Sequence, residues 1–142
     1  MKAKNCLIFG GTGQIGRNLI RKLAKNNYKV TVITRNAHTK GNFIKTQANA
    51  GYIEVVEANP FDEDEIRPYF EKSDVCINLI GILFEKGKKN SFNNIHSNFP
   101  LLLSKLCHQN KIKQFIHLSA LGIEKALNSK YAMSKLSGEK NI

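Results

Sequence analysis

Apolar residues in this chain form short runs that alternate with longer segments in which they recur every three or four positions. Short apolar runs between polar or glycine-containing stretches predict strands, and the longer periodicity predicts amphipathic helices. Strands are expected near residues 5–9, 29–34, 52–57, 75–80 and 114–119. Helices are expected near residues 14–26, 63–72, 92–110 and 129–142, with a bend or a restart just before Pro100.

The alternation of strands with helices decides the fold class. It requires parallel strands joined by right-handed crossovers, which gives an α/β fold with a doubly wound parallel sheet of Rossmann type. The 142 residues contain no repeat or linker that would divide them, so we expect a single domain over residues 1–142. Residues 35–51 are polar and irregular, which predicts a mobile loop or a short helix.

A glycine-rich segment, Gly10-Gly11-Thr12-Gly13-Gln14-Ile15-Gly16, joins the first expected strand to the first expected helix. Gly11, Gly13 and Gly16 fit the dinucleotide-binding spacing, and starting from Gly10 gives the wider Gly-x-x-Gly-x-x-Gly form. In either register the glycines permit a tight turn, close approach of a pyrophosphate and close helix packing, while the helix N-terminus faces the phosphates. An ordinary glycine-rich turn is the alternative, but the flanking strand and helix favour a nucleotide site.

The end of the second expected strand bears on the choice of cofactor. An acidic residue there would bind the adenosine ribose hydroxyls and repel a 2′-phosphate, but this chain has Thr34, Arg35 and Asn36 instead. The guanidinium of Arg35 can bind a phosphate with two hydrogen bonds and stack on adenine, whereas the alternative is a solvated arginine. We therefore expect NADP(H) rather than NAD(H).

Two polar stretches follow later strands at the sheet edge where ligands bind in this architecture. Asn59 follows the third strand and could hydrogen-bond the adenine edge, and Gly81 ends the segment that begins at Asn78 and could let the chain pass close to the nicotinamide ribose. Taken alone, each stretch is equally compatible with a plain turn.

A second candidate motif is Tyr131-Ala132-Met133-Ser134-Lys135. Because residues i and i+4 share one face of a helix, Lys135 can lower the pKa of the Tyr131 phenol and hold the nicotinamide ribose, which is acid–base chemistry suited to hydride transfer. The spacing is common on surface helices. Its position after the fifth strand, whose end carries Ser119, favours the functional interpretation.

The formal net charge of +11 raises nucleic acid as a partner, but 18 of the 22 basic residues are dispersed lysines, and the cluster at 86–89 lacks interleaved aromatic residues. We expect no nucleic-acid binding, a solvated loop at 86–89 and at most weak attraction to acidic lipids. Three separated cysteines indicate a reducing compartment and no metal site. No run spans a membrane and no signal peptide is evident, so we expect a cytoplasmic location, either free or peripheral to the inner face of the membrane.

Three segments carry a resemblance to a known family: Ile-Asn-Leu-Ile-Gly-Ile-Leu-Phe-Glu at 77–85, Phe-Ile-His-Leu-Ser-Ala-Leu-Gly at 115–122, and the Tyr131 motif followed by Gly-Glu-Lys at 138–140. The chain resembles the atypical, epimerase-like branch of the short-chain dehydrogenase/reductase superfamily, in particular the nucleotide-binding accessory subunits of respiratory complex I and their bacterial relatives. This resemblance implies NADP(H) binding and a role in assembly or stability of the complex, or in a step connected with quinones.

The resemblance also implies which residues meet the cofactor. The glycine segment would meet the pyrophosphate, Arg35 the 2′-phosphate, and Tyr131 with Lys135 the nicotinamide ribose. The expected cofactor contacts are Gly10, Gly11, Thr12, Gly13, Gln14, Ile15, Gly16, Arg35, Asn59, Leu79, Ile80, Gly81, Leu118, Ser119, Tyr131 and Lys135. The candidate catalytic residues are Tyr131, Lys135 and Ser119.

Two departures from the family pattern limit this carry-over. Ser119 lies only twelve positions before Tyr131, which favours a strand-end residue over a catalytic hydroxyl. The chain also ends at Ile142, whereas family members continue with a sixth strand and a substrate region, so the fifth strand is expected to have a free edge open to self-association or a partner. Three functions therefore remain open: a complex I accessory or assembly protein, a reductase or epimerase, and a degenerate or split gene product that only binds nucleotide.

Overall fold

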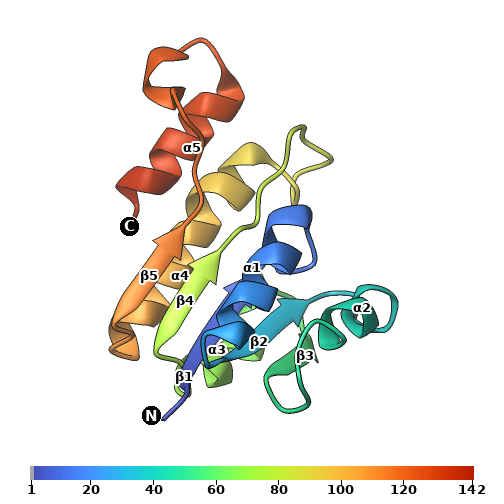
Figure 1. Ribbon diagram of the computed structural model, residues 1–142. Helices are drawn as coiled ribbons and strands as arrows, with labels where there is room; N and C mark the ends of the chain where they lie inside the picture. Colours follow the sequence, from blue (N-terminus) through green and yellow to red (C-terminus); the bar gives the residue numbers. More distant parts are fainter. Residues whose placement is uncertain (1) are drawn as a thin grey trace.

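The computed structural model describes residues 2–142, which form a five-stranded sheet in the order β3-β2-β1-β4-β5 (Figure 1). All four strand pairs are parallel. The strands are β1 (Lys4–Phe9), β2 (Tyr28–Thr34), β3 (Ile53–Glu57), β4 (Val75–Asn78) and β5 (Gln114–His117). The sheet confirms the expected α/β fold of Rossmann type, whose strand order reverses between β1 and β4.

Helices cover both faces of the sheet. They are α1 (Gln14–Lys25), η1 (Ala37–Gly41), α2 (Asn42–Lys45), α3 (Glu63–Phe70), η2 (Asn93–Asn98), α4 (Phe99–Gln109), η3 (Ile123–Lys125) and α5 (Lys130–Lys140). One core contains Ile20 of α1 and Ile44 of α2, and the other contains Phe70 of α3 and Leu103 of α4. Because β1 lies between these two cores, its residues from Cys6 to Phe9 are fully buried, as expected for a central parallel strand.

The register brings the carboxyl ends of the central strands together. Phe9 pairs with Ile33 on one side and with Asn78 on the other, and Asn78 pairs with His117. The chain segments that leave β1, β2, β4 and β5 therefore meet along one edge of the sheet, where ligands bind in open α/β sheets.

Most element boundaries agree with the sequence-based expectations, and the fourth helix shows why Pro100 matters. The segment begins as a π-helix, η2, and restarts as the α-helix α4 at Phe99, with the proline in its first turn. A proline is tolerated there because its missing N–H would have no partner in the helix. The expected restart just before Pro100 is confirmed.

Two strands differ in detail from the expectation. Strands β4 and β5 end at Asn78 and His117, each two residues before the predicted end. The polar segment 35–51 contains two short helical turns, η1 and α2, in agreement with the short helix that was one of its two expected forms. Within residues 2–142, no helix has the length and apolar character needed to cross a membrane.

Strand β5 lies at one end of the sheet and pairs only with β4 among the described residues. Its apolar side chain Ile116 and the following Leu118 are 41% and 39% exposed. The expected free edge is therefore present in this part of the chain.

Candidate dinucleotide site

The turn between β1 and α1 depends on glycine at two positions. Gly10 has a φ of +79°, and a Cβ there would lie 2.9 Å from the backbone nitrogen of Ile80. A Cβ at Gly16 would lie 2.5 Å from Cα of Gly11, so the helix crosses the turn at a distance that no other residue allows. Gly10 makes the left-handed turn, which means that the Gly10, Gly13, Gly16 register describes the geometry.

Gly13 differs from these two because the space beside it is open. It is exposed, and a Cβ there would meet only the carbonyl oxygen of Gly10, at 3.6 Å. Gly13 caps α1 without any side-chain hydrogen bond, and the exposed residues Gln14 and Ile15 follow it in the first turn. Unpaired N–H groups at the helix start, next to a position without a side chain, suit a pyrophosphate.

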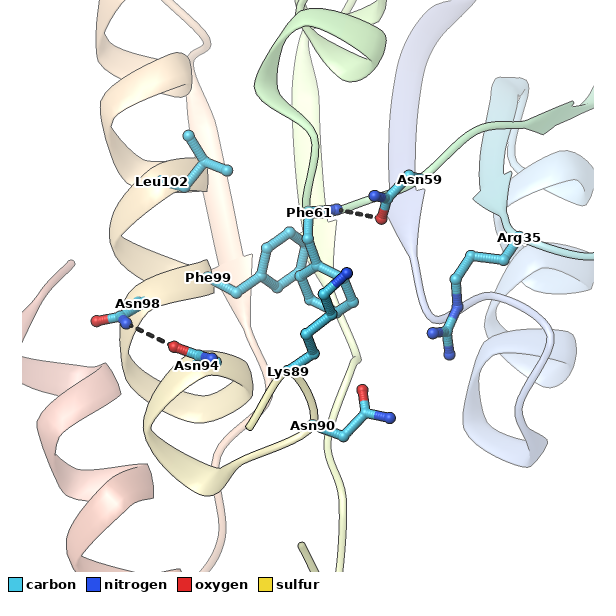
Figure 2. Close-up of a pocket in the computed structure, with 9 residues that line it drawn as sticks. All are labelled: Arg35, Asn59, Phe61, Lys89, Asn90, Asn94, Asn98, Phe99 and Leu102. Atoms are coloured by element: carbon cyan, nitrogen blue, oxygen red, sulfur yellow. Dashed lines mark hydrogen bonds between the residues drawn. The ribbon is translucent and has the colours of Figure 1, made fainter. Parts of the chain in front are cut away.

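Arg35 lies where the expected 2′-phosphate site requires a cation. Its side chain is exposed, and within residues 2–142 its guanidinium has no hydrogen bond or ion pair. It lines two neighbouring cavities, one of about 140 Å³ with Gly10, Thr12 and Lys40, and one of about 570 Å³ on the side of α4. Both cavities are lined by Arg35 and Phe61, so they adjoin each other between the glycine turn and helix α4. Figure 2 shows these two residues in the larger cavity.

Asn59 lines the larger cavity, at the edge of the sheet where it was expected, but its side-chain oxygen is bound to the backbone. Its Oδ1 accepts a hydrogen bond from the Phe61 backbone N–H at 3.1 Å, which leaves the Nδ2 group for a ligand. Two carboxylates of neighbouring segments accept backbone hydrogen bonds: Glu65 accepts from the Asn59 N–H at 2.6 Å and Glu57 accepts from the Ala37 N–H at 3.0 Å. The cavity lining itself contains no carboxylate.

At the ends of β4 and β5, a buried amide and an imidazole hold the two strands together. Asn78 is fully buried, and its Oδ1 accepts from the Ile80 N–H at 3.1 Å. Its Nδ2 therefore donates to Nδ1 of His117, 3.1 Å away, and the proton of that ring lies on Nε2. The Leu79 N–H still donates to the Phe9 carbonyl at 2.9 Å, but the Ile80 N–H is taken by the Asn78 side chain, so the pairing of β4 does not continue to the predicted Ile80.

A third group, His96 of η2, joins the segment after β4 to helix α5. The ring is fully buried, its Nε2 accepts from the Ile82 N–H at 3.0 Å, and its Nδ1 donates to Ser134 Oγ at 2.9 Å. The Ser134 hydroxyl in turn donates to the Tyr131 carbonyl at 2.7 Å. Burial and the nearby Lys135 charge lower the pKa of His96 to about 4, so the ring is neutral, as this pattern of donors requires.

Lys135 and Tyr131 lie beside this network. The Lys135 ammonium is 4% exposed and donates to the Leu118 carbonyl at 2.9 Å, and burial lowers its pKa. A Cβ at Gly81 would lie 3.9 Å from the ammonium nitrogen, so the strand-end glycine and the lysine do meet. The Tyr131 ring contacts the His96 ring edge-on at 5.3 Å, and within residues 2–142 its phenol makes no hydrogen bond with Lys135.

Ser119 lies two residues beyond β5, as the strand-end interpretation expects. Its Oγ is buried and has no hydrogen-bond partner among residues 2–142. A buried hydroxyl without a partner costs free energy, and a ligand oxygen at this place would satisfy it. Together with the glycine cradle and the unpaired Arg35, this observation shows that the residues present fit a dinucleotide.

Sequence reasoning missed three members of this region: His96, His117 and Lys89, which lines the larger cavity. His96 lies in no motif, His117 lies in the 115–122 segment but had no role assigned to it, and Lys89 was expected in a solvated loop. The assignments of individual residues to cofactor contacts stay predictions, although the structure places the glycine turn, Arg35, Asn59, Gly81, Ser119 and Lys135 along one edge of the sheet.

Comparison with known proteins identifies the family. The profile of the NAD dependent epimerase/dehydratase family matches residues 6–142. The chain belongs to this family. It is 29% identical over 136 residues to subunit 9 of the NADH dehydrogenase [ubiquinone] 1 alpha subcomplex, mitochondrial, from Arabidopsis thaliana, and 28% identical over 135 residues to the same subunit of Mus musculus.

These matches cover 95% of this chain but only 34% and 36% of the two relatives, so the chain spans about a third of their length. Among solved structures, Pen from Bacillus thuringiensis has a TM-score of 0.83 at 20% identity, covering 99% of this chain and 44% of that one. A short-chain dehydrogenase/reductase from Serratia marcescens has a TM-score of 0.78 at 15% identity, covering 96% and 64%. These two likenesses support the fold.

Proposed function

We propose that this chain binds NADP(H) and serves as a nucleotide-binding accessory or assembly factor linked to respiratory complex I or to quinone metabolism. The observation that carries the proposal is the continuous surface from the Gly10 turn to the unpaired Arg35. Family membership supports dinucleotide binding, and the relatives from Arabidopsis thaliana and Mus musculus are both named as subunit 9 of the NADH dehydrogenase [ubiquinone] 1 alpha subcomplex.

The preference for the 2′-phosphorylated cofactor rests on charge. Arg35 and Lys40 line the cavity beside the glycine turn, and its lining contains no carboxylate. A charge-assisted hydrogen bond contributes about 1.5–3 kcal/mol, so NADPH should bind about tenfold or more tightly than NADH.

Calorimetric titration with both cofactors tests this preference. Arg35→Asp should invert the order, because a carboxylate there would repel the 2′-phosphate and accept from ribose hydroxyls. Arg21→Asp, on the outer side of α1 where Arg21 contacts Gln47, changes the net charge equally and should leave the order intact. Equal affinities of the parent protein for NADPH and NADH would contradict the preference.

The link to the respiratory complex is tested in cells. Affinity purification of the tagged protein from detergent-solubilised membranes should recover respiratory subunits, and deletion of the gene should reduce assembled complex I. We place the protein in the cytoplasm, with at most weak attraction of its net charge of +11 to acidic lipids on the inner face of the membrane. Absence of respiratory subunits at normal expression would favour the third alternative, a split or degenerate product that only binds nucleotide.

A reductase or epimerase activity is the second candidate, and one observation favours it. The buried ammonium of Lys135 lies near Gly81 and one helical turn from Tyr131. A family enzyme uses such a pair for proton transfer and ribose binding. Oxidation of NADPH with a panel of carbonyl compounds, abolished by Tyr131→Phe, would establish this activity; an unchanged absorbance at 340 nm over a long incubation would exclude it for those compounds.

A further inference from the structure

A cavity of about 570 Å³ between Arg35 and helix α4 has a lining in which only Arg35 and Asn59 were expected as cofactor contacts. Figure 2 shows Arg35 on one side and Lys89 on the other, with Asn59, Asn90, Asn94 and Asn98 among the remaining wall residues. Two cations and four amides without a carboxylate suit an anionic group, while Phe61, Phe99 and Leu102 supply an apolar wall, so the cavity fits a ligand that carries both.

The position of Lys89 is fixed by a small hairpin. The Lys86 N–H donates to the Asn90 carbonyl at 3.1 Å, and Gly87 at the tip has a φ of +73°. The Asn94 amide donates to the Lys88 carbonyl at 2.8 Å, which ties the hairpin to η2. These contacts hold the backbone on both sides of Lys89, and its exposed side chain lines the cavity.

A further bond anchors the base of the same hairpin. Glu85 accepts a hydrogen bond from the Phe92 N–H at 2.9 Å, so its carboxylate is directed to the backbone at the start of the helix. Asn98 donates to Asn94 at 2.9 Å and thereby orients the amide that holds Lys88 (Figure 2). Glu85, the carboxylate closest to Lys89 in sequence, therefore binds a backbone N–H, and Lys89 has no ion pair within residues 2–142.

We propose that Lys89 is a second cationic contact for the ribose 2′-phosphate of NADP(H), reaching from the 86–90 hairpin across the cavity from Arg35. This inference rests on the proposed binding of NADP(H). A phosphate monoester carries close to two negative charges and three acceptor oxygens, so it can accept from a guanidinium on one side and an ammonium on the other. The hairpin then closes the adenosine side of the site.

The test uses fragments that contain only the adenosine half of the cofactor. Affinities of the full chain for adenosine 2′,5′-bisphosphate and for 5′-AMP are measured by calorimetry in the parent, in Lys89→Gln and in Lys88→Gln. Lys88 is the matched control because it is exposed, adjacent and outside the cavity lining. Lys89→Gln should weaken the bisphosphate about tenfold and leave 5′-AMP within twofold, whereas Lys88→Gln should change neither.

Three outcomes decide between the claims. Equal effects of Lys89→Gln and Lys88→Gln, in a parent that prefers the bisphosphate, would overturn the role of Lys89 and leave NADP(H) binding intact. A parent that binds NADH and NADPH alike would overturn both the cofactor preference and this inference, while still binding a dinucleotide. Loss of 5′-AMP affinity together with bisphosphate affinity in Lys89→Gln would show that the lysine supports the hairpin fold and does not contact phosphate.

Discussion

Replacing His96 by asparagine and by glutamine separates the two hydrogen bonds that this buried ring makes. The Asn Nδ2 group can take over donation to Ser134, which now comes from the ring Nδ1 at 2.9 Å. The Gln Oε1 atom reaches the position of the ring Nε2, which accepts from the Ile82 N–H at 3.0 Å. Both variants lose the ring contacts with Phe92 and Tyr131, so their difference reports the two hydrogen bonds together with the one methylene by which the side chains differ.

The expected difference follows from what each variant leaves unsatisfied. In His96→Asn the partly buried Ile82 N–H has no acceptor, which costs about 1–3 kcal/mol. In His96→Gln the Ser134 hydroxyl loses a donor but still donates to the Tyr131 carbonyl, so the cost is smaller. The glutamine variant should therefore be more stable by about 1–2 kcal/mol, or roughly 2–8 °C in Tm for a domain of this size.

Urea denaturation followed by circular dichroism gives this difference, provided that the slope of unfolding free energy against urea is the same in both variants. His108→Gln, at an exposed position near the end of α4, is the control for the substitution itself and should cost little. Equal midpoints for the two His96 variants, or a more stable asparagine variant, would refute the claim that the Ile82 contact is the stabilising one.

Three further predictions follow from the same geometry. Gly16→Ala should destabilise the fold by about 1–3 kcal/mol, because its Cβ would lie 2.5 Å from the turn backbone. Gly13→Val, at a position with open space, should keep the circular dichroism spectrum of the parent and lose nucleotide affinity in calorimetry. The folded-state pKa of His96 is about 4 against an ordinary 6.5, so the unfolded state binds more protons between these two pH values. The free energy of unfolding should therefore fall by about 3 kcal/mol as the pH drops through this window. Urea titrations at several pH values should show a smaller loss in His96→Gln than in the parent protein. Hydrogen exchange should be slowest in β1 and β4 and fastest after Gly122. Sedimentation should show self-association through the β5 edge. A monomer whose last helix is as protected as β1 would contradict both expectations.

Local patterns in the sequence were enough to predict the parts of the fold that depend on neighbouring residues. The apolar run of β1, the glycine turn and the restart at Pro100 each follow from a few adjacent side chains and their backbone preferences. The strand ends were less accurate because the side chain of Asn78 takes the Ile80 N–H, which a plain apolar run gives no reason to expect. The register of the glycine motif also required coordinates, since two glycine triplets fitted equally well.

The parts of the site that sequence reasoning missed depend on contacts between distant residues. His96 bonds to Ser134, 38 positions later, and Asn78 bonds to His117, 39 positions later. Neither pair has a spacing that a helix or strand would bring together, so only the packing of η2, β5 and α5 reveals them. Lys89 was hidden for a different reason, because its neighbours Lys86 and Lys88 share its charge and only the hairpin geometry distinguishes it.

The distribution of charge along the edge of the sheet gives the site a direction. Near α5, burial lowers the pKa of both His96 and His117 to about 4, so among these rings and Lys135 only the lysine carries a charge at neutral pH. At the other end, Arg35 and Lys89 line one cavity without a carboxylate. A dinucleotide with a 2′-phosphate is itself asymmetric, because its adenosine half carries the additional anion. Electrostatic attraction therefore favours placing the adenosine half beside Arg35, which leaves the nicotinamide half beside the single ammonium of Lys135 and the unpartnered Ser119 hydroxyl.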